Sequence, residues 1–222
     1  GEYPNNYTVY YTYGVALRAA GELQKAMDAF EQAAELAPQA TGIESPRGQM
    51  ASIAQELGDR SRAMRELELL LQYDGTSLEA ARELAALAEE AGDETLMALA
   101  YDRVIGIDPF DPVPHQAIGR LAMAHGDIEQ AVLEFEIALA AGPIDQVSAY
   151  CDLAESYFLV GNVEAAKREI LKALEVAPTY ERAQEILLRS TKSAKCCNTS
   201  RALQHLNLTA SNWVKLLNGS FS

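Results

Sequence analysis

Apolar residues recur along the chain with helical spacing, and glycines interrupt this pattern at nearly constant intervals. Five of them are separated by 37, 34, 34 and 35 residues: Gly21, Gly58, Gly92, Gly126 and Gly161. Each stands between two stretches in which apolar residues return every three or four positions, as on one face of an α-helix. Glycine tolerates the left-handed backbone that closes a helix and lets the chain reverse. The pattern therefore predicts five antiparallel pairs of helices.

The residues around each glycine keep a common register. Small residues stand seven positions before it: Gly14, Ala51, Ala85, Gly119 and Ala154. Larger residues stand nine positions after it: Phe30, Leu67, Tyr101, Phe135 and Ile170. Proline or glycine follows 17 positions after it: Pro38, Gly75, Pro109, Pro143 and Pro178. Small residues let two helices approach closely and the larger residue fills the notch, while proline ends the second helix.

This register resembles the tetratricopeptide repeat, a pair of helices of about 34 residues. In the first repeat the signature positions hold Tyr10, Tyr13, Gly14, Leu17, Ala26, Phe30, Ala33 and Pro38. The resemblance implies an all-α fold, a right-handed α–α superhelix of five helical hairpins with a closing helix at its C-terminal end. After a lead-in at 1–6, the predicted repeats span 7–178 and are 7–40, 44–77, 78–111, 112–146 and 147–180.

Several residues depart from the repeat pattern. Arg47 and His115 occupy the first aromatic position of their repeats, and for the histidine we expect a packing role. Gly75 replaces a proline, and Met97 stands where alanine is usual. The three inserted residues Thr41 to Ile43 must lengthen the loop before the second repeat. These departures affect local geometry and leave the predicted fold unchanged.

The chain changes character after the last repeat. Residues 181–190 read as a helix with Ala183, Ile186 and Leu187 on one face, suited to cover the apolar end of the array. Residues 191–222 contain no acidic residue and have a charge of +4, with Ser, Thr, Asn and scattered large apolar residues. Two interpretations of this tail stay open. It is a dispensable extension, or it is a basic, apolar segment that folds against an acidic face of its own or a neighbouring chain.

The resemblance also implies a function. Tetratricopeptide arrays bind extended or helical peptides along the concave surface formed by the first helix of each hairpin, so we expect a protein–protein interaction scaffold. The candidate groove residues are Tyr11, Arg18, Ser52, Gln55, Arg82, Glu89, Gln116, Arg120, Met123, Cys151, Glu155 and Phe158. The lysines and asparagines with which some relatives grip a C-terminal carboxylate are missing. The alternatives are a C-terminal accessory module of a larger enzyme, such as a hydrolase, and a self-assembly element that forms a homodimer through its ends or its tail.

Charge and composition exclude several other functions. A net charge of −14 and a pI near 4.6 argue against nucleic acid as a partner. No apolar run is long enough for membrane insertion, so we expect a soluble protein. The three histidines form no metal-ligating motif, and no glycine-rich phosphate loop is present. We therefore expect neither catalysis nor a metal or cofactor, and free thiols at Cys151, Cys196 and Cys197.

The N-terminal helix is unusually aromatic. Five tyrosines crowd it or precede it: Tyr3, Tyr7, Tyr10, Tyr11 and Tyr13. Either they are partly buried within the first repeat, or an earlier repeat, an upstream domain or a partner subunit packs on them. The chain begins with Gly1 and shows no signal peptide, which we interpret as a cut end. The sequence favours the cytoplasm; a periplasmic or secreted location would require a signal further upstream.

Overall fold

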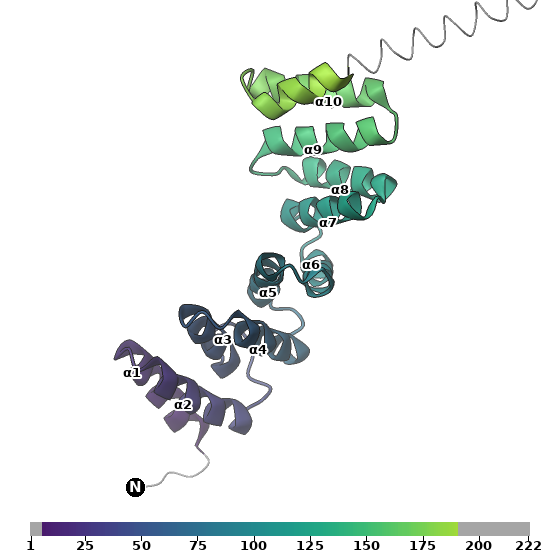
Figure 1. Ribbon diagram of the computed structural model, residues 1–222. Coiled ribbons are helices and arrows are strands. Elements are labelled where there is room, and N and C mark those ends of the chain that lie inside the picture. Colours follow the sequence, from purple (N-terminus) through teal and green to yellow (C-terminus); the bar gives the residue numbers. More distant parts are fainter. Residues whose placement is uncertain (1–5, 191–222) are drawn as a thin grey trace, which may run out of the picture. The chain divides into compact units, whose positions relative to one another are not determined.

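The computed structural model describes residues 6–190, and all regular elements within this range are helices (Figure 1). They are α1 (Tyr7–Ala19), α2 (Leu23–Leu36), α3 (Pro46–Glu56), α4 (Arg60–Tyr73), α5 (Leu78–Ala91), α6 (Glu94–Ile107), α7 (Pro112–His125), α8 (Ile128–Ala141), α9 (Gln146–Leu159), α10 (Val163–Val176) and a last helix at 181–190. The described residues form two compact units, 6–114 and 115–190, which are described separately. None of the helices in the described range is long and apolar enough to cross a membrane. The tail at 191–222, and with it both interpretations of that segment, lies outside the described residues.

The five regularly spaced glycines end the first helix of each hairpin, as predicted. Gly21, Gly58, Gly92, Gly126 and Gly161 all have positive φ angles, between 71° and 81°. A polar residue follows each of them, and in four of the five hairpins its side chain accepts a hydrogen bond from the backbone of the next helix; Asp59 and Asp93 are examples. The short turn therefore closes one helix and starts the next within two or three residues.

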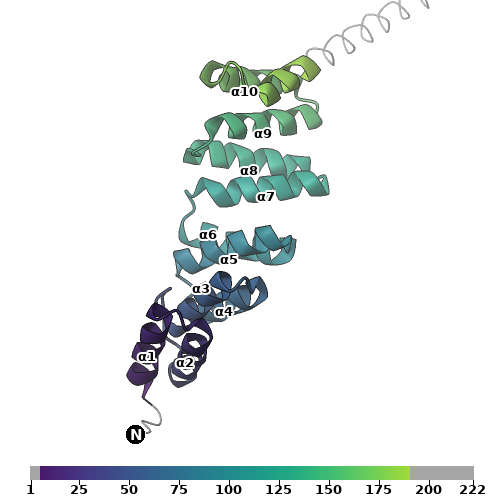
Figure 2. The ribbon, with the colours of Figure 1, turned by 60° about the vertical axis from the view of Figure 1, so that its left-hand side comes forward.

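The N-terminal unit consists of the hairpins α1–α2, α3–α4 and α5–α6, in which the paired helices lie side by side (Figures 1 and 2). Between hairpins, α2 packs on α3 and α4 packs on α5. Phe30 is fully buried, and its ring lies so close to Gly14 that an added Cβ would be 2.9 Å away. The small residue and the large residue of one repeat thus meet inside their own hairpin.

The C-terminal unit contains α8, α9, α10, the helix at 181–190 and α7 from His115 onward. One core cluster joins Ala131 and Phe135 of α8 to Leu153 of α9. A second cluster joins α9 and α10 to the last helix, which contributes Ala183 and Ile186. Residues 181–190 therefore form a helix whose apolar face covers α9 and α10, as the sequence predicts.

Arg47 and His115, which replace an aromatic residue in their repeats, each have a polar partner on the second helix of their hairpin. Arg47 Nη1 lies 3.1 Å from Glu66 Oε2, and His115 Nδ1 lies 2.8 Å from Glu134 Oε2. Glu66 and Glu134 occupy the same position in their repeats, one residue before the large core residue. His115 is buried, which confirms the expected packing role and adds a hydrogen bond to it. A polar pair thus replaces an aromatic contact in these hairpins.

The inserted residues before the second repeat form a longer loop, as predicted, between Leu36 at the end of α2 and Pro46 at the start of α3. Gly42, with φ of 80°, donates its N–H to Asp74 Oδ2 at 2.9 Å, which attaches the loop to the end of α4. Gly48 is buried beneath this loop, and an added Cβ would lie 1.9 Å from the Ile43 carbonyl oxygen. The insertion therefore requires glycine at position 48.

Candidate functional site

Three consecutive first helices of the N-terminal unit share a polar surface. Arg18 on α1 donates to the Ser52 hydroxyl on α3 at 2.7 Å. The same guanidinium hydrogen-bonds Gln49 and forms an ion pair with Glu56, both on α3. Arg18 and Ser52, which the repeat pattern places on one groove, therefore contact each other directly.

The polar surface continues from α3 to α5. Gln55 Nε2 donates to Glu83 Oε2 at 3.5 Å. Burial raises the pKa of the Glu83 carboxyl, the hydrogen bond from Gln55 lowers it, and the nearby charge of Glu79 raises it, with a net upward shift. We call Arg18, Gln49, Ser52, Gln55, Glu56 and Glu83 the first-helix surface. It is a mixed strip of donors and acceptors that links three hairpins.

Tyr11 lies beside this surface but has mainly a packing role. Its ring stacks on Tyr7 with a centroid distance of 5.8 Å and meets Phe30 edge-on at 5.6 Å. Its hydroxyl donates to the Glu44 carbonyl oxygen at 2.7 Å. Tyr11 thus joins α1 to the loop before α3, and burial raises the pKa of its phenol.

The remaining candidates of this unit lie on α5. Arg82 donates through Nε to Asp111 Oδ2 at 2.9 Å and lies 3.5 Å from Asp108 Oδ2, while half of its side chain stays exposed. It lines a pocket of about 260 Å³ together with Tyr101, Asp111, Val113 and Pro114. Glu89 accepts a hydrogen bond from the Tyr101 hydroxyl at 2.9 Å. Both candidates therefore have partners within the unit and remain accessible at its surface.

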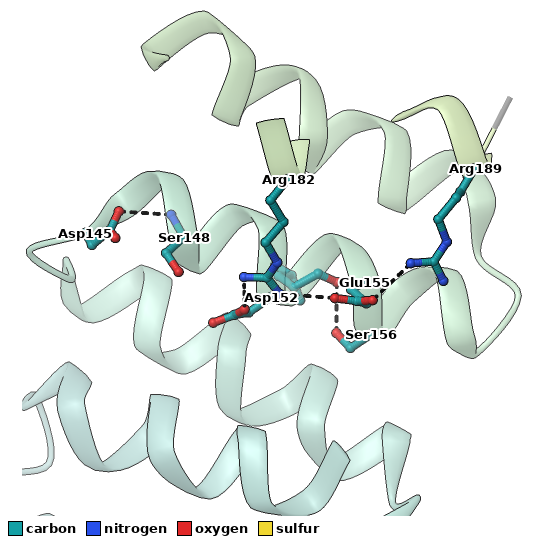
Figure 3. Close-up of polar contacts among 8 residues, drawn as sticks. Asp145, Ser148, Asp152, Glu155, Ser156, Arg182 and Arg189 are labelled. Carbon is teal, nitrogen blue, oxygen red and sulfur yellow. Dashed lines mark hydrogen bonds and ion pairs between the residues drawn. The ribbon is translucent and has the colours of Figure 1, made fainter. Parts of the chain in front are cut away.

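In the C-terminal unit, an ion-pair network connects α9 to the last helix (Figure 3). Arg182 contacts Asp152 Oδ1 at 2.6 Å and Glu155 Oε2 at 3.1 Å. Arg189 contacts Glu155 Oε1 at 3.2 Å, and its guanidinium lies 5.4 Å from the centroid of the Phe158 ring. The last helix therefore covers Glu155 and Phe158, two residues predicted for the groove.

Burial shapes the chemistry of two neighbouring residues on α9. It raises the pKa of the Asp152 carboxyl, although the charges of Arg182 and Arg120 lower it. Burial also raises the pKa of the Cys151 thiol to about 11, so the thiol is protonated at neutral pH. Cys151 is fully buried against Ala154 and Ile170, so its prediction as a groove residue is wrong: the position points into the core rather than to solvent.

The three candidates on α7 differ in exposure. Arg120 is exposed and lies close enough to Asp152 to affect its pKa, while Gln116 is partly buried. Met123 packs against the cluster of Ala122, Ala131, Phe135 and Leu153, which makes it partly a core residue. Within the C-terminal unit Arg120 is thus exposed, Cys151 is buried, and the other candidates are partly accessible: Gln116, Met123, Glu155 and Phe158.

Sequence reasoning missed the partners of the candidate residues. Asp152 is adjacent to a predicted groove residue, and Arg182 and Arg189 lie on a helix assigned only a covering role. The sequence does contain a signal for this network. Asp152 and Glu155 lie three residues apart on α9, and the basic residues Arg182 and Arg189, which face them, lie seven apart on the last helix. Glu56 on α3 was missed in the same way. Across residues 6–190, no group of three or more His, Cys, Asp and Glu side chains is arranged to hold a metal ion.

Removing Arg182 tests the network. Arg182→Met is expected to lower the free energy of unfolding by about 1 kcal/mol, because it leaves Asp152 buried without its ion pair. The loss of stability should be smaller at mildly acidic pH. The buried Asp152 carboxyl has a raised pKa, so it becomes protonated there and no longer needs a positively charged partner. Urea unfolding at neutral and acidic pH measures both effects. Adding Asp152→Asn should recover part of the loss; no recovery would contradict this account.

Comparisons with known proteins agree with the repeat architecture. Family models described as tetratricopeptide repeat match residues 7–40 and 117–182. The chain therefore contains tetratricopeptide repeats. No curated protein sequence matches the chain.

Solved structures with a similar fold include two of MamA and one of YrrB. A crystal structure of MamA is 21% identical, covers 79% of this chain and 95% of its own, and gives a TM-score of 0.59. MamA 41-end from Desulfovibrio magneticus RS-1 is 16% identical, covers 79% of this chain and 97% of its own, and gives a TM-score of 0.56. YrrB, a TPR protein with an unusual peptide-binding site, is 16% identical, covers 82% of this chain and 92% of its own, and gives a TM-score of 0.62. At these identities the likeness concerns the fold.

Proposed function

We propose that the chain is a non-catalytic scaffold that binds a segment of a partner protein along the first-helix surface of its N-terminal unit. The observation that carries this proposal is the continuous strip from Arg18 through Ser52 and Gln55 to Glu83, which crosses three consecutive first helices. A strip of this kind presents regularly spaced polar groups to a ligand that runs across the helices. The tetratricopeptide fold and the peptide-binding site of YrrB support the same function.

The chemistry of the strip favours recognition of a peptide backbone. Gln55 is exposed, and its amide both donates and accepts hydrogen bonds, so it can pair with a backbone N–H or C=O. Arg18 is already compensated by Glu56, so the surface offers little net positive charge to a carboxylate. An extended segment with polar side chains therefore suits the strip better than an acidic C-terminus.

Affinity selection from a displayed random-peptide library, with the full chain immobilised, would provide a ligand. Isothermal titration of the enriched peptide should then show binding to the wild type. Arg18→Glu places a second negative charge beside Glu56 and removes three contacts across the strip. We expect it to weaken binding about tenfold or more.

Arg65→Glu provides the matched control, because it makes the same charge change at an exposed position of α4, a second helix. It should leave the affinity within a factor of about two. Equal affinity of the wild type and Arg18→Glu would rule out the first-helix surface as the binding site. Failure to enrich any peptide would count against peptide binding itself.

A further inference from the structure

The pocket beside α5, which we call the α5 pocket, lies at a place that other hairpins fill. Two of its lining residues are Arg82 and Tyr101, which stand ten positions before and nine positions after the turn glycine Gly92. The equivalent pair in the first hairpin is Tyr11 and Phe30, whose rings meet edge-on at 5.6 Å. The α5 pocket thus lies where an aromatic side chain covers the core of the first hairpin.

Two further first helices close the same place in different ways. On α3 the position of Arg82 is taken by Gly48, and the Ile43 carbonyl oxygen lies so close that an added Cβ would be 1.9 Å away. On α9 it is taken by Cys151, which is fully buried in one cluster with Ile170. On α5 the Arg82 side chain stays half exposed. The α5 pocket is therefore a feature of the third hairpin rather than a consequence of the repeat.

The size and lining of the α5 pocket suit a single side chain of a ligand. Its volume of about 260 Å³ is below the roughly 300–1,000 Å³ of typical small-molecule sites. Val113, Pro114 and the Tyr101 ring form its apolar lining, and Val113 is 49% exposed. The aliphatic stem of a lysine or arginine packs on such a surface while its charged end stays near water and polar groups.

The charged groups at the α5 pocket favour a cation. Asp111 is nearly buried, and its Oδ2 lies 2.9 Å from Arg82 Nε and 2.8 Å from Arg82 Nη2. Asp108 Oδ2 lies 3.5 Å from the same Nη2, and the Asp108 side chain is 39% exposed. Two carboxylates therefore lie beside one guanidinium, so these three side chains together carry one negative charge. A carboxylate ligand that approached Arg82 would be repelled by both aspartates.

Backbone hydrogen bonds hold both carboxylates in place. The Phe110 N–H donates to Asp108 Oδ1 at 3.2 Å, and the Val113 N–H donates to Asp111 Oδ1 at 3.0 Å. Asp111 Oδ2 has two short contacts with Arg82, whereas Asp108 Oδ2 has one longer contact. Asp108 Oδ2 is thus the oxygen that can accept a further donor at little cost.

We propose that the α5 pocket anchors a lysine or arginine side chain of the partner segment, with the cationic end at Asp108 and the aliphatic stem on Val113 and Pro114. Arg82 directly precedes Glu83, the last residue of the first-helix surface. A segment bound along that surface can therefore place a side chain in the pocket. The proposal rests on the proposed function and adds the chemistry of the partner, which is a basic segment.

An NMR titration of the isotope-labelled full chain with Nα-acetyl-arginine N-methylamide tests the pocket without any partner segment. We expect saturable shifts of the backbone amides of Phe110 and Val113. The dissociation constant should be on the order of millimolar, since one side chain makes few contacts. The acetyl-citrulline analogue has nearly the same shape without the positive charge, so it should bind at least about fivefold more weakly.

Two substitutions should change the affinity for the arginine derivative in opposite directions. Asp108→Asn removes a negative charge but keeps an oxygen for the Phe110 N–H, and it should weaken binding about fivefold. Arg82→Gln removes the competing positive charge and should strengthen binding about twofold or more. Asp102→Asn, the same charge change as Asp108→Asn at an exposed position of α6, is the matched control and should leave the affinity within a factor of about two. Circular dichroism checks that each variant is folded.

Several outcomes would overturn the proposal. Weaker binding of the arginine derivative by Arg82→Gln and stronger binding by Asp108→Asn would assign the pocket to an anion. Absence of a saturable shift, or equal affinity for the citrulline analogue, would rule out a cation site. A peptide enriched by library selection that contains neither lysine nor arginine would contradict the basic partner. Arg18→Glu should bind the arginine derivative like the wild type, so this proposal and the proposed function fail separately.

Discussion

Replacing Gly48 with alanine is expected to lower the free energy of unfolding by about 3 kcal/mol or more. The added Cβ would lie 1.9 Å from the Ile43 carbonyl oxygen and 2.8 Å from Ile43 Cα. These are backbone atoms, so no side-chain rotation relieves the clash and the loop at 41–45 must move. That movement would also pull Gly42 away from Asp74. Urea unfolding followed by circular dichroism measures the loss.

Gly106→Ala separates this clash from the general effect of adding a methyl group to a helix. Gly106 lies within α6, is exposed, and would have no heavy atom within 4 Å of its new Cβ. The substitution should stabilise the chain by about 0.5–1 kcal/mol through helix propensity. If Gly48→Ala were no more destabilising than Gly106→Ala, the close approach of the loop would be disproved.

The hairpin architecture could be predicted from the sequence because it depends on local and repeated features. A turn glycine needs a left-handed backbone whatever its surroundings, so Gly21 and Gly161 could be assigned from spacing alone. The close approach of two helices likewise follows from a small residue facing a large one. The lengthened loop could be predicted because three extra residues must be placed outside the helices. The requirement for glycine at position 48 could not be predicted, because it arises from the path of the loop.

The candidate groove residues were less predictable because their exposure depends on what neighbouring helices cover. Counting in the repeat placed Arg18 and Ser52 together, and they do hydrogen-bond. The same count placed Cys151 on the surface, although it is buried in the cluster that α9 forms with α10 and the last helix. Glu155 and Phe158 are covered by the last helix, whose Arg182 and Arg189 contact them. Position within a repeat therefore predicts packing better than it predicts accessibility.

The small and large core positions vary together among the hairpins. Where the large residue is phenylalanine, at Phe30 and Phe135, its small partner is glycine. Where it is leucine or isoleucine, the small partner is alanine, as in the buried pairs Ala51–Leu67 and Ala154–Ile170. The space between the two helices thus holds a nearly constant volume, and each pair fills it differently. Ala85 with Tyr101 is an exception, in which the tyrosine hydroxyl reaches Glu89.

This covariation predicts compensation. Gly119→Ala would bring a Cβ to 2.7 Å from Phe135 Cε1 and should lower the free energy of unfolding by about 2 kcal/mol. Phe135→Leu alone should cost about 1–2 kcal/mol because it leaves a cavity in the core. The double variant recreates the pair found at Ala51 and Leu67, so it should be more stable than the sum of the single losses by about 1 kcal/mol or more. A double-mutant cycle from urea unfolding measures this coupling. Additive losses would mean that the two helices do not share one fixed packing volume.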